Sequence, residues 1–221
     1  MGSYRFDHDL EFFRTCSHEE LEELETILIW GTKKNKDQNK RNISEQITRE
    51  PLWKEFHETD RTKYWSLLAR ELQEYGGNTI INTGRGGGVY YREILEDVMK
   101  KVKTPFDGSL STSVNEQNLL SKVFADSMCN FSKEQQERII RELDKNGFPS
   151  NLAEIGTGIV EMLKLGGMGT VISYFTGPIG WLYAGEWIIF GPAYRITKPA
   201  VIRVSILRII KSAELNNEAN C

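Results

Sequence analysis

The stretch from Leu165 to Tyr194 places the strongest constraint on what this chain can fold into. It reads LGGMGTVISYFTGPIGWLYAGEWIIFGPAY, and Glu186 is its only charged residue. The whole chain, by contrast, carries 28 Lys and Arg against 31 Asp and Glu. Because water disfavours so much contiguous apolar surface, the stretch must either enter a membrane or be buried against protein.

The length of this stretch argues against a conventional single-pass anchor. A helix needs about 20 apolar residues to cross the hydrocarbon layer. Gly177-Pro178 interrupts the run, because proline lacks a backbone donor and disfavours helix just before it. The run therefore splits near Thr176 into two pieces, each of about 12 or 13 residues and too short to span alone. We expect a helical hairpin that is either buried as core or able to insert into a bilayer, as pore-forming proteins do.

The residues of this region fit both a buried core and a membrane-associated segment. Small residues at helical spacing allow close helix packing, tryptophans suit a membrane interface, and the basic residues of a final helix expected over about 198 to 215 favour an anionic surface. Those basic residues do not gather on one face, however, and a helix apolar nearly all round is typical of a core, with Arg203 paired to an acid or reaching out by its stem. The membrane or hairpin candidates are Gly169, Ser173, Gly177, Pro178, Gly180, Trp181, Glu186, Trp187, Arg195, Lys198, Arg203, Arg208 and Lys211.

Charge and cysteine usage exclude several classes of protein. The formal net charge of -3 gives no global field that would attract nucleic acid, and the mean hydropathy of -0.43 is typical of a soluble protein. Cys16, Cys129 and Cys221 are odd in number and far apart, which predicts three free thiols. The N-terminal residues include acids where a secretory signal needs basic residues before an apolar run. We therefore expect a protein of the cytoplasm, or of the periphery of the inner membrane.

Helix signals dominate the rest of the chain. Three capping boxes predict helix starts: Ser17 with Glu20, Ser113 with Glu116, and Ser132 with Gln135. Two more helices are expected over about 60–75, closed by Gly76-Gly77, and about 89–103, closed before Pro105. No strand-like alternation stands out. The sequence predicts an all-α protein with an N-terminal helical domain (1–104), a linker and helical pair (105–150) and a C-terminal Gly-rich hydrophobic helical unit (151–221).

The stretch GGNTIINTGRGGGVYYRE, residues 76–93, resembles a phosphate-binding loop in composition. Gly84 and Gly86 are followed by Val89 where the dinucleotide fingerprint needs a third glycine, no strand precedes them, and there is no Gly-Lys-Ser/Thr. The pattern favours a packed turn between two helices over an anion site. The partner or anion-binding candidates are Arg85, Gly86, Gly88, Tyr91 and Arg92.

Other candidate chemistry is weak. Asp7, His8 and Asp9, with Cys16 and His18, match no recurring set of metal ligands. No arrangement of nucleophile, acid and base stands out. We therefore expect no cofactor and no metal, and we lean against an enzyme.

The chain resembles the YaaW-like family of uncharacterised bacterial proteins, which is sometimes labelled as related to ubiquinol-cytochrome c chaperones. The resemblance rests on residues in three parts of the chain, of which the middle part is the most specific. These are Tyr4, Asp7, Asp9, Leu10, Cys16 and Ser17; Glu71, Leu72, Gln73, Gly76, Gly77, Arg85, Gly86, Gly88, Tyr91, Arg92, Ile94 and Leu95; and Gly177, Pro178, Gly180, Ala193, Tyr194, Arg195, Pro199, Ala200 and Val201. The resemblance implies an intracellular helical protein without an established activity, and the chaperone label implies binding of a client protein.

These expectations lead to a non-enzymatic bacterial binding or scaffold protein whose C-terminal unit associates with a membrane or with a partner's apolar surface. Two alternatives remain open: a chaperone-like client-binding module, and a pore-forming toxin or defence effector that inserts residues 165–194. The expected partners are a protein or an anionic membrane surface. Nucleic acid is not expected, and a small-molecule ligand is disfavoured.

Overall fold

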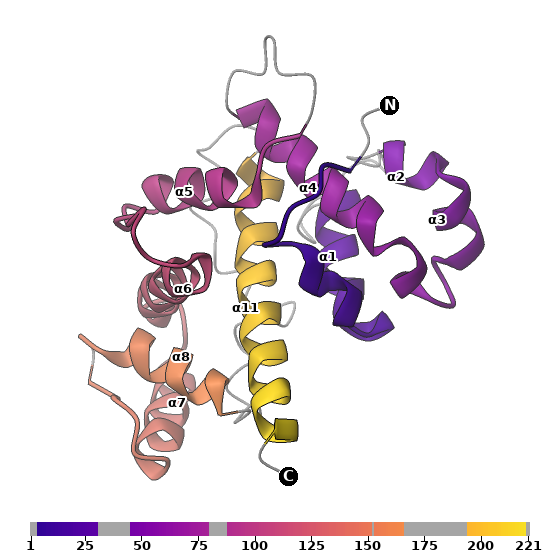
Figure 1. The fold of residues 1–221 in the computed structure, drawn as a ribbon. Coiled ribbons are helices and arrows are strands. Elements are labelled where there is room, and N and C mark those ends of the chain that lie inside the picture. The colour runs from indigo at the N-terminus through magenta and orange to yellow at the C-terminus, as the bar shows by residue number, and fades with distance from the viewer. Residues whose placement is uncertain (1–3, 31–44, 80–87, 152, 166–193, 220–221) are drawn as a thin grey trace. The chain divides into compact units, whose positions relative to one another are not determined.

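The computed structural model describes residues 4–30, 45–79, 88–151, 153–165 and 194–219. Within these ranges every regular element is a helix and no strand occurs (Figure 1). The prediction of an all-α fold is confirmed. The predicted hairpin lies outside the described residues.

The chain divides into two compact units. The first comprises Met1–Val98 and Glu186–Val204, and the second comprises Met99–Gly185 and Ser205–Cys221. The first unit holds η1 (Glu11–Thr15), α1 (His18–Trp30), α2 (Glu45–Arg49), α3 (Pro51–Phe56), η3 (Arg61–Tyr64), α4 (Trp65–Thr79) and most of α5 (Tyr91–Lys101). The second holds α6 (Thr112–Met128), α7 (Lys133–Lys145) and α8 (Ile155–Lys164). The last helix, α11 (Tyr194–Ala219), contributes residues up to Val204 to the first unit and the rest to the second.

The core of the first unit forms where α1 packs against α4 (Figure 1). Leu21, Leu24 and Leu28 recur along one face of α1 and are buried, as are Leu68 and Leu72 on α4. This spacing produces the apolar stripe that a helix presents to a core. Each buried leucine contributes roughly 2 kcal/mol. The shorter helices η1, α2, α3 and η3 pack around this pair.

The core of the second unit forms where α6 packs against α8. At Gly156 an added Cβ would overlap the backbone carbonyl oxygen of Ser121 on α6, and at Gly158 it would overlap that of Pro149. The two glycines therefore bring the start of α8 into direct contact with backbone. Ile139 and Leu143 bury the apolar face of α7 in the same unit.

Two of the three predicted capping boxes are confirmed. At the start of α1, Ser17 N donates to Glu20 Oε2 (2.6 Å) and Glu20 N donates to Ser17 Oγ (3.3 Å). Ser132 and Gln135 form the same reciprocal pair at the start of α7. Each cap satisfies two of the amide donors that a helix start leaves without a partner.

The third predicted box is wrong. Ser111, and not Ser113, caps α6, because its Oγ accepts from Val114 N (3.3 Å). Glu116 is buried one turn further along. The nearby Asn115 side chain fixes the preceding loop instead, accepting from Asp107 N (3.0 Å) and donating to Asp107 O (2.9 Å).

The predicted end of the helix at Gly76-Gly77 is also wrong, since α4 continues to Thr79. Gly76 lies against the side chain of Ile94, where a Cβ would overlap it. This glycine therefore gives α5 room to approach α4. The final helix is longer than predicted, beginning at Tyr194 and containing Pro199.

Candidate functional site

The Gly-rich turn meets the N-terminal segment in the first unit. The Gln73 side chain binds both backbone groups of Arg5, accepting from its N (3.2 Å) and donating to its O (2.9 Å). Arg5 Nη1 donates to Gly88 O (3.2 Å), and a Cβ on Gly88 would lie 2.7 Å from Gln73 Cβ. Gln73 thus joins the N-terminal segment to α4, and Gly88 supplies the space that this close contact requires.

Asp7 occupies the N-terminus of α5. Its Oδ2 accepts from Tyr91 N (2.6 Å), its Oδ1 accepts from Asp9 N (3.0 Å), and the residue is buried. A helix N-terminus favours negative charge, which is why such positions bind phosphates. Here the Asp7 carboxylate accepts the hydrogen bond from the Tyr91 amide that a bound anion would otherwise accept.

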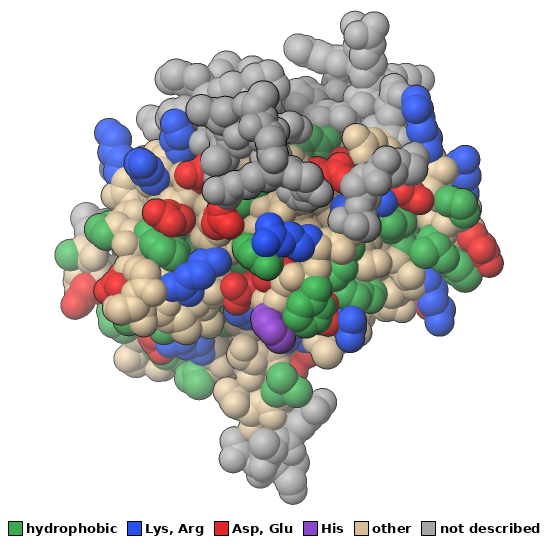
Figure 2. All heavy atoms as spheres, turned by 45° about the horizontal axis from the view of Figure 1, so that its top comes forward, with side chains coloured by type: hydrophobic (Ala, Val, Ile, Leu, Met, Phe, Trp, Pro, Cys, Tyr) green, Lys and Arg blue, Asp and Glu red, His purple; other side chains and the backbone are tan. Residues whose placement is uncertain are grey.

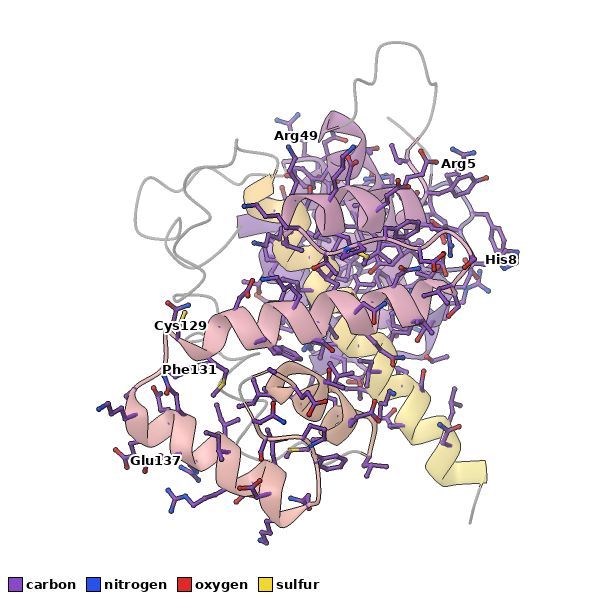
Figure 3. The ribbon with its side chains drawn as sticks, turned by 90° about the vertical axis from the view of Figure 1, so that its left-hand side faces the viewer. Arg5, His8, Arg49, Cys129, Phe131 and Glu137 are labelled. Carbon is purple, nitrogen blue, oxygen red and sulfur yellow. The ribbon has the colours of Figure 1, made fainter. Side chains whose placement is uncertain are left out.

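The remaining residues predicted for this turn are only partly described. Tyr91 is fully buried and Arg92 is half-buried on α5. Arg85 and Gly86 lie outside the described residues. Arg5, which the sequence analysis did not single out, stacks its guanidinium on the exposed ring of Tyr90 with 3.6 Å to the ring centre (Figure 3).

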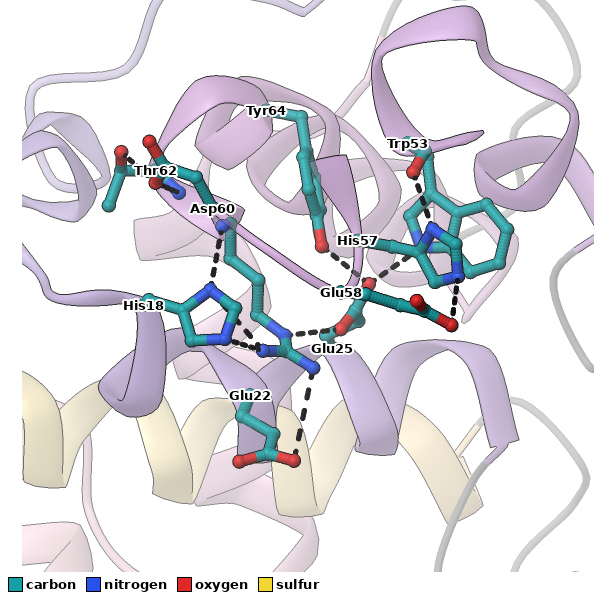
Figure 4. Close-up of polar contacts among 10 residues, drawn as sticks. His18, Glu22, Glu25, Trp53, His57, Glu58, Asp60, Thr62 and Tyr64 are labelled. Atoms are coloured by element: carbon teal, nitrogen blue, oxygen red, sulfur yellow. Dashed lines mark hydrogen bonds and ion pairs between the residues drawn. The ribbon is translucent and has the colours of Figure 1, made fainter. Parts of the chain in front are cut away.

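A second polar group, the Glu25 cluster, consists of Glu25, Trp53, Arg61 and Tyr64 (Figure 4). Glu25 Oε1 accepts from Trp53 Nε1 (2.6 Å) and Tyr64 Oη (2.8 Å). Its Oε2 accepts from Arg61 Nε (2.6 Å). One buried carboxylate on α1 therefore binds α3 and both ends of η3.

The sequence carried a signal for this cluster that was missed. Glu25 lies on the same helical face of α1 as Leu21 and Leu28, since it follows the first by four residues and precedes the second by three. An acid inside an apolar stripe needs a partner, because an unpaired buried charge is costly. The partners could not be named from sequence, as they lie 28 to 39 residues further along the chain.

The Glu25 cluster is organised to hold structure. Burial, and then the hydrogen bond to Glu25, raise the pKa of the Tyr64 hydroxyl well above its ordinary range. The phenol and the indole both donate to the Glu25 carboxylate. The geometry therefore suits a junction between helices and not proton transfer to a substrate.

His18, weighed above as a weak metal candidate, lies next to this cluster. Arg61 N donates to His18 Nδ1 (3.1 Å), and Arg61 Nη1 lies 2.5 Å from Nε2. The other histidine of the region, His57, stacks on Trp53 with 4.1 Å between ring centres. The described residues hold no group of three or more His, Cys, Asp or Glu placed to bind a metal ion.

Three basic residues of α11, Arg203, Arg208 and Lys211, have acidic partners inside their own units. In the first unit Arg203 Nη1 lies 3.1 Å from Glu23 Oε2, which confirms the predicted pairing with an acid. In the second unit Arg208 Nε donates to buried Glu116 (2.6 Å), and Lys211 pairs with Glu214 (2.8 Å). Lys198 is half-buried, and the side chain of Arg195 is not described.

The other hairpin candidates, from Gly169 to Trp187, lie outside the described residues. Among the residues that are described, no helix joins enough length to enough apolar character to span a bilayer. The face in Figure 2 shows acidic and basic side chains interspersed among hydrophobic ones. Cys129 is an exposed thiol at the end of α6 (Figure 3), Cys16 is a buried thiol, and neither forms a disulfide.

Comparison with known proteins identifies relatives over nearly the whole chain. A UPF0174 protein of Helicobacter pylori strain J99 is 32% identical over 250 residues, which cover 98% of this chain and 96% of that protein. The UPF0174 protein YaaW of Escherichia coli K12 is 29% identical, with 96% of this chain and 98% of that protein covered. A domain of unknown function, DUF3944, matches residues 4–41, and no solved structure matches. The chain belongs to the UPF0174 family of YaaW-like bacterial proteins.

Proposed function

We propose that this protein is a non-enzymatic binding or scaffold protein, and that its C-terminal unit binds the apolar surface of a partner protein through residues 165–194. The observation that carries the choice of a protein over a membrane is the internal pairing of the basic residues on α11. Arg203 and Arg208 bind Glu23 and Glu116 within their own units.

The pairing matters because attraction to an anionic bilayer depends on available positive charge. Each basic residue near such a surface contributes about 1 kcal/mol. Arg203 and Arg208 are largely buried, and their charges are balanced by acids 2.6 to 3.1 Å away. The apolar area of residues 165–194 is then the main source of affinity, and an apolar protein surface offers it a specific site.

The described flanks of the apolar segment support the same proposal. It follows α8, whose Ile159, Val160 and Leu163 are buried, and it precedes α11, which is buried on most sides. Leu165, the last residue described before the segment, is 72% exposed. The segment is thus bounded on each side by a helix that packs within its own unit.

The two polar groups of the first unit support a role without catalysis. Asp7 already caps α5, and Glu25 already binds three donors. We therefore infer that neither group holds a cofactor or a small-molecule ligand, and the net charge of -3 favours no nucleic-acid partner. The proposed location is the cytoplasm, or the periphery of the inner membrane.

A photocrosslinking amino acid at Trp181 or Trp187, introduced in living cells, tests the proposal. We expect each position to give the same protein adduct of discrete mass, and a matched crosslinker at exposed Leu215 on α11 to give none. Lipid adducts without a protein adduct would instead identify membrane insertion. A smear of many client proteins would favour the chaperone-like alternative.

Flotation with lipid vesicles distinguishes membrane binding from binding of a protein partner. On the proposed function, the wild-type protein stays at the bottom of the gradient with neutral and with anionic vesicles. If it floats with anionic vesicles, and Lys198→Glu with Lys211→Glu abolishes flotation, the protein binds membranes by charge and the proposal is wrong. Release of a trapped dye from these vesicles would identify a pore former.

A further inference from the structure

The contact between His18 and Arg61 places an imidazole against two donors of one residue. Arg61 N–H donates to Nδ1 at 3.1 Å, and the guanidinium Nη1 lies 2.5 Å from Nε2 (Figure 4). His18 is the first residue of α1, and Arg61 is the first residue of η3. The imidazole therefore joins the start of one helix to the start of the other.

This contact depends on the protonation of the ring. A neutral imidazole has one nitrogen that accepts a hydrogen bond, whereas a protonated imidazole has two donors and no acceptor. Protonated His18 would turn N–H groups toward both Arg61 donors. It would also place two positive charges within hydrogen-bond distance, at a helix N-terminus that already disfavours positive charge.

We propose that the His18–Arg61 contact is an acid-sensitive latch on the backbone at the start of η3: the neutral imidazole accepts a hydrogen bond from the Arg61 amide, and the protonated imidazole releases that amide while the Glu25 cluster keeps η3 on α1. Histidine is the side chain that changes charge between about pH 5 and 8. Acid would thus release the Arg61 amide at the start of η3 without a ligand. The latch is independent of the function proposed for residues 165–194.

Carboxylates near the ring can pair with the imidazole when it is protonated. On its own helix, Glu19 interacts electrostatically with His18 and lies one residue away, and on the facing loop Asp60 does the same. Arg61 remains bound to Glu25 by Nε, with Glu22 Oε1 at 3.8 Å from Nη2. Protonated His18 therefore exchanges Arg61 for a carboxylate, while Arg61 keeps its place in the Glu25 cluster.

Amide hydrogen exchange measured by NMR tests the latch, because the Arg61 amide is itself a partner of the ring. After correction for the intrinsic effect of pH on exchange, we expect protection of this amide to fall about tenfold between about pH 7.5 and about pH 5. The Leu120 amide, in the core helix α6, should keep its protection. The imidazole resonances of His18 should titrate with the same midpoint as the Arg61 amide.

Two variants make the test specific. In His18→Asn, Oδ1 takes the position of Nδ1 and cannot be protonated, so the Arg61 amide should be protected equally at both pH values. His57→Asn, which removes the neighbouring histidine, should leave the wild-type response intact. Unchanged protection in the wild type, a fall that persists in His18→Asn, or an equal fall at Leu120 would each overturn the proposal.

Discussion

The first compact unit buries charged side chains in its core, whereas the second brings helix backbones into direct contact. In the first unit Asp7, Glu25 and Arg203 are buried and bind groups from other elements. In the second, Gly156 and Gly158 lie against carbonyl oxygens, and one buried ion pair joins Glu116 to Arg208. The first unit therefore depends on paired buried charges and the second on the absence of side-chain atoms.

This difference predicts which substitutions each unit should tolerate. A polar core fails when one partner is removed, because the other is left buried without a hydrogen bond. A backbone contact fails when a single methyl group is added, because a carbonyl cannot rotate away as a flexible side chain can. Substitutions that add atoms should harm the second unit most, and substitutions that remove atoms should harm the first.

The largest effect is expected for Gly156→Val. The new side chain would overlap the Ser121 carbonyl, so α8 must move away from α6 and lose buried apolar contact. We expect a loss of at least about 4 kcal/mol in the free energy of unfolding, measured by urea denaturation. The control is Gly108→Ala, where an added Cβ would meet nothing within 4 Å. Equal stability of the two variants would show that α8 is not held by this contact.

The second-largest loss of stability is expected when side-chain atoms are removed from the first unit. Glu25→Ala leaves the Arg61 guanidinium, the Tyr64 hydroxyl and the Trp53 N–H without their acceptor, at a cost of about 3 kcal/mol. Glu22→Ala is the matched control, because that side chain is 62% exposed and 3.8 Å from Arg61. It should change stability by less than about 0.5 kcal/mol. A loss of under 1 kcal/mol in Glu25→Ala would contradict the view of a polar core.

Only the structural features with a local signal in the sequence could be predicted. Helix periodicity and caps are local, so the long helices, the all-α class and the caps at Ser17 and Ser132 could be read directly. The helices η1, α2 and α3 have five or six residues each, which is fewer than two turns, and such lengths carry no periodic signal. Ser113 was predicted as a cap because Glu116 follows it by three residues, whereas Ser111, the observed cap, is followed at that spacing by Val114 and carries no capping-box signal.

The candidate sites were harder to predict than the helices. The Gly-rich turn was recognised, but its partner Asp7 lies 84 residues from Tyr91, and nothing local links the two. Glu25 was not predicted as part of a site, although its place among leucines marked it as buried. Pairing of Arg203 could be predicted because a cation on an apolar face requires an acid, but Glu23 is far away in sequence and could not be named.

A smaller effect in the first unit is expected from Tyr64→Phe, which removes one hydrogen bond to Glu25 and should cost about 1.5 kcal/mol. Burial raises the pKa of Tyr64, so the folded state favours the protonated phenol. Its contribution is complete below the ordinary tyrosine value of 10.0 and is lost as the pH rises above it. Thermal melts at increasing alkaline pH should therefore fall less steeply for Tyr64→Phe than for the wild type. Tyr90→Phe, at an exposed ring, should keep the wild-type slope.

The smallest effect should come from Gly147→Ala, which separates two uses of glycine within the second unit. Gly147 follows α7 with a φ of +74°, and an added Cβ would meet nothing within 4 Å. The cost is therefore only that of an L-residue in the left-handed region, about 1 kcal/mol by urea denaturation. Gly147→Asn should cost less, since asparagine adopts this region more readily than alanine does. If Gly147→Ala were as damaging as Gly156→Val, backbone conformation rather than contact with carbonyl oxygens would explain why the second unit needs glycine.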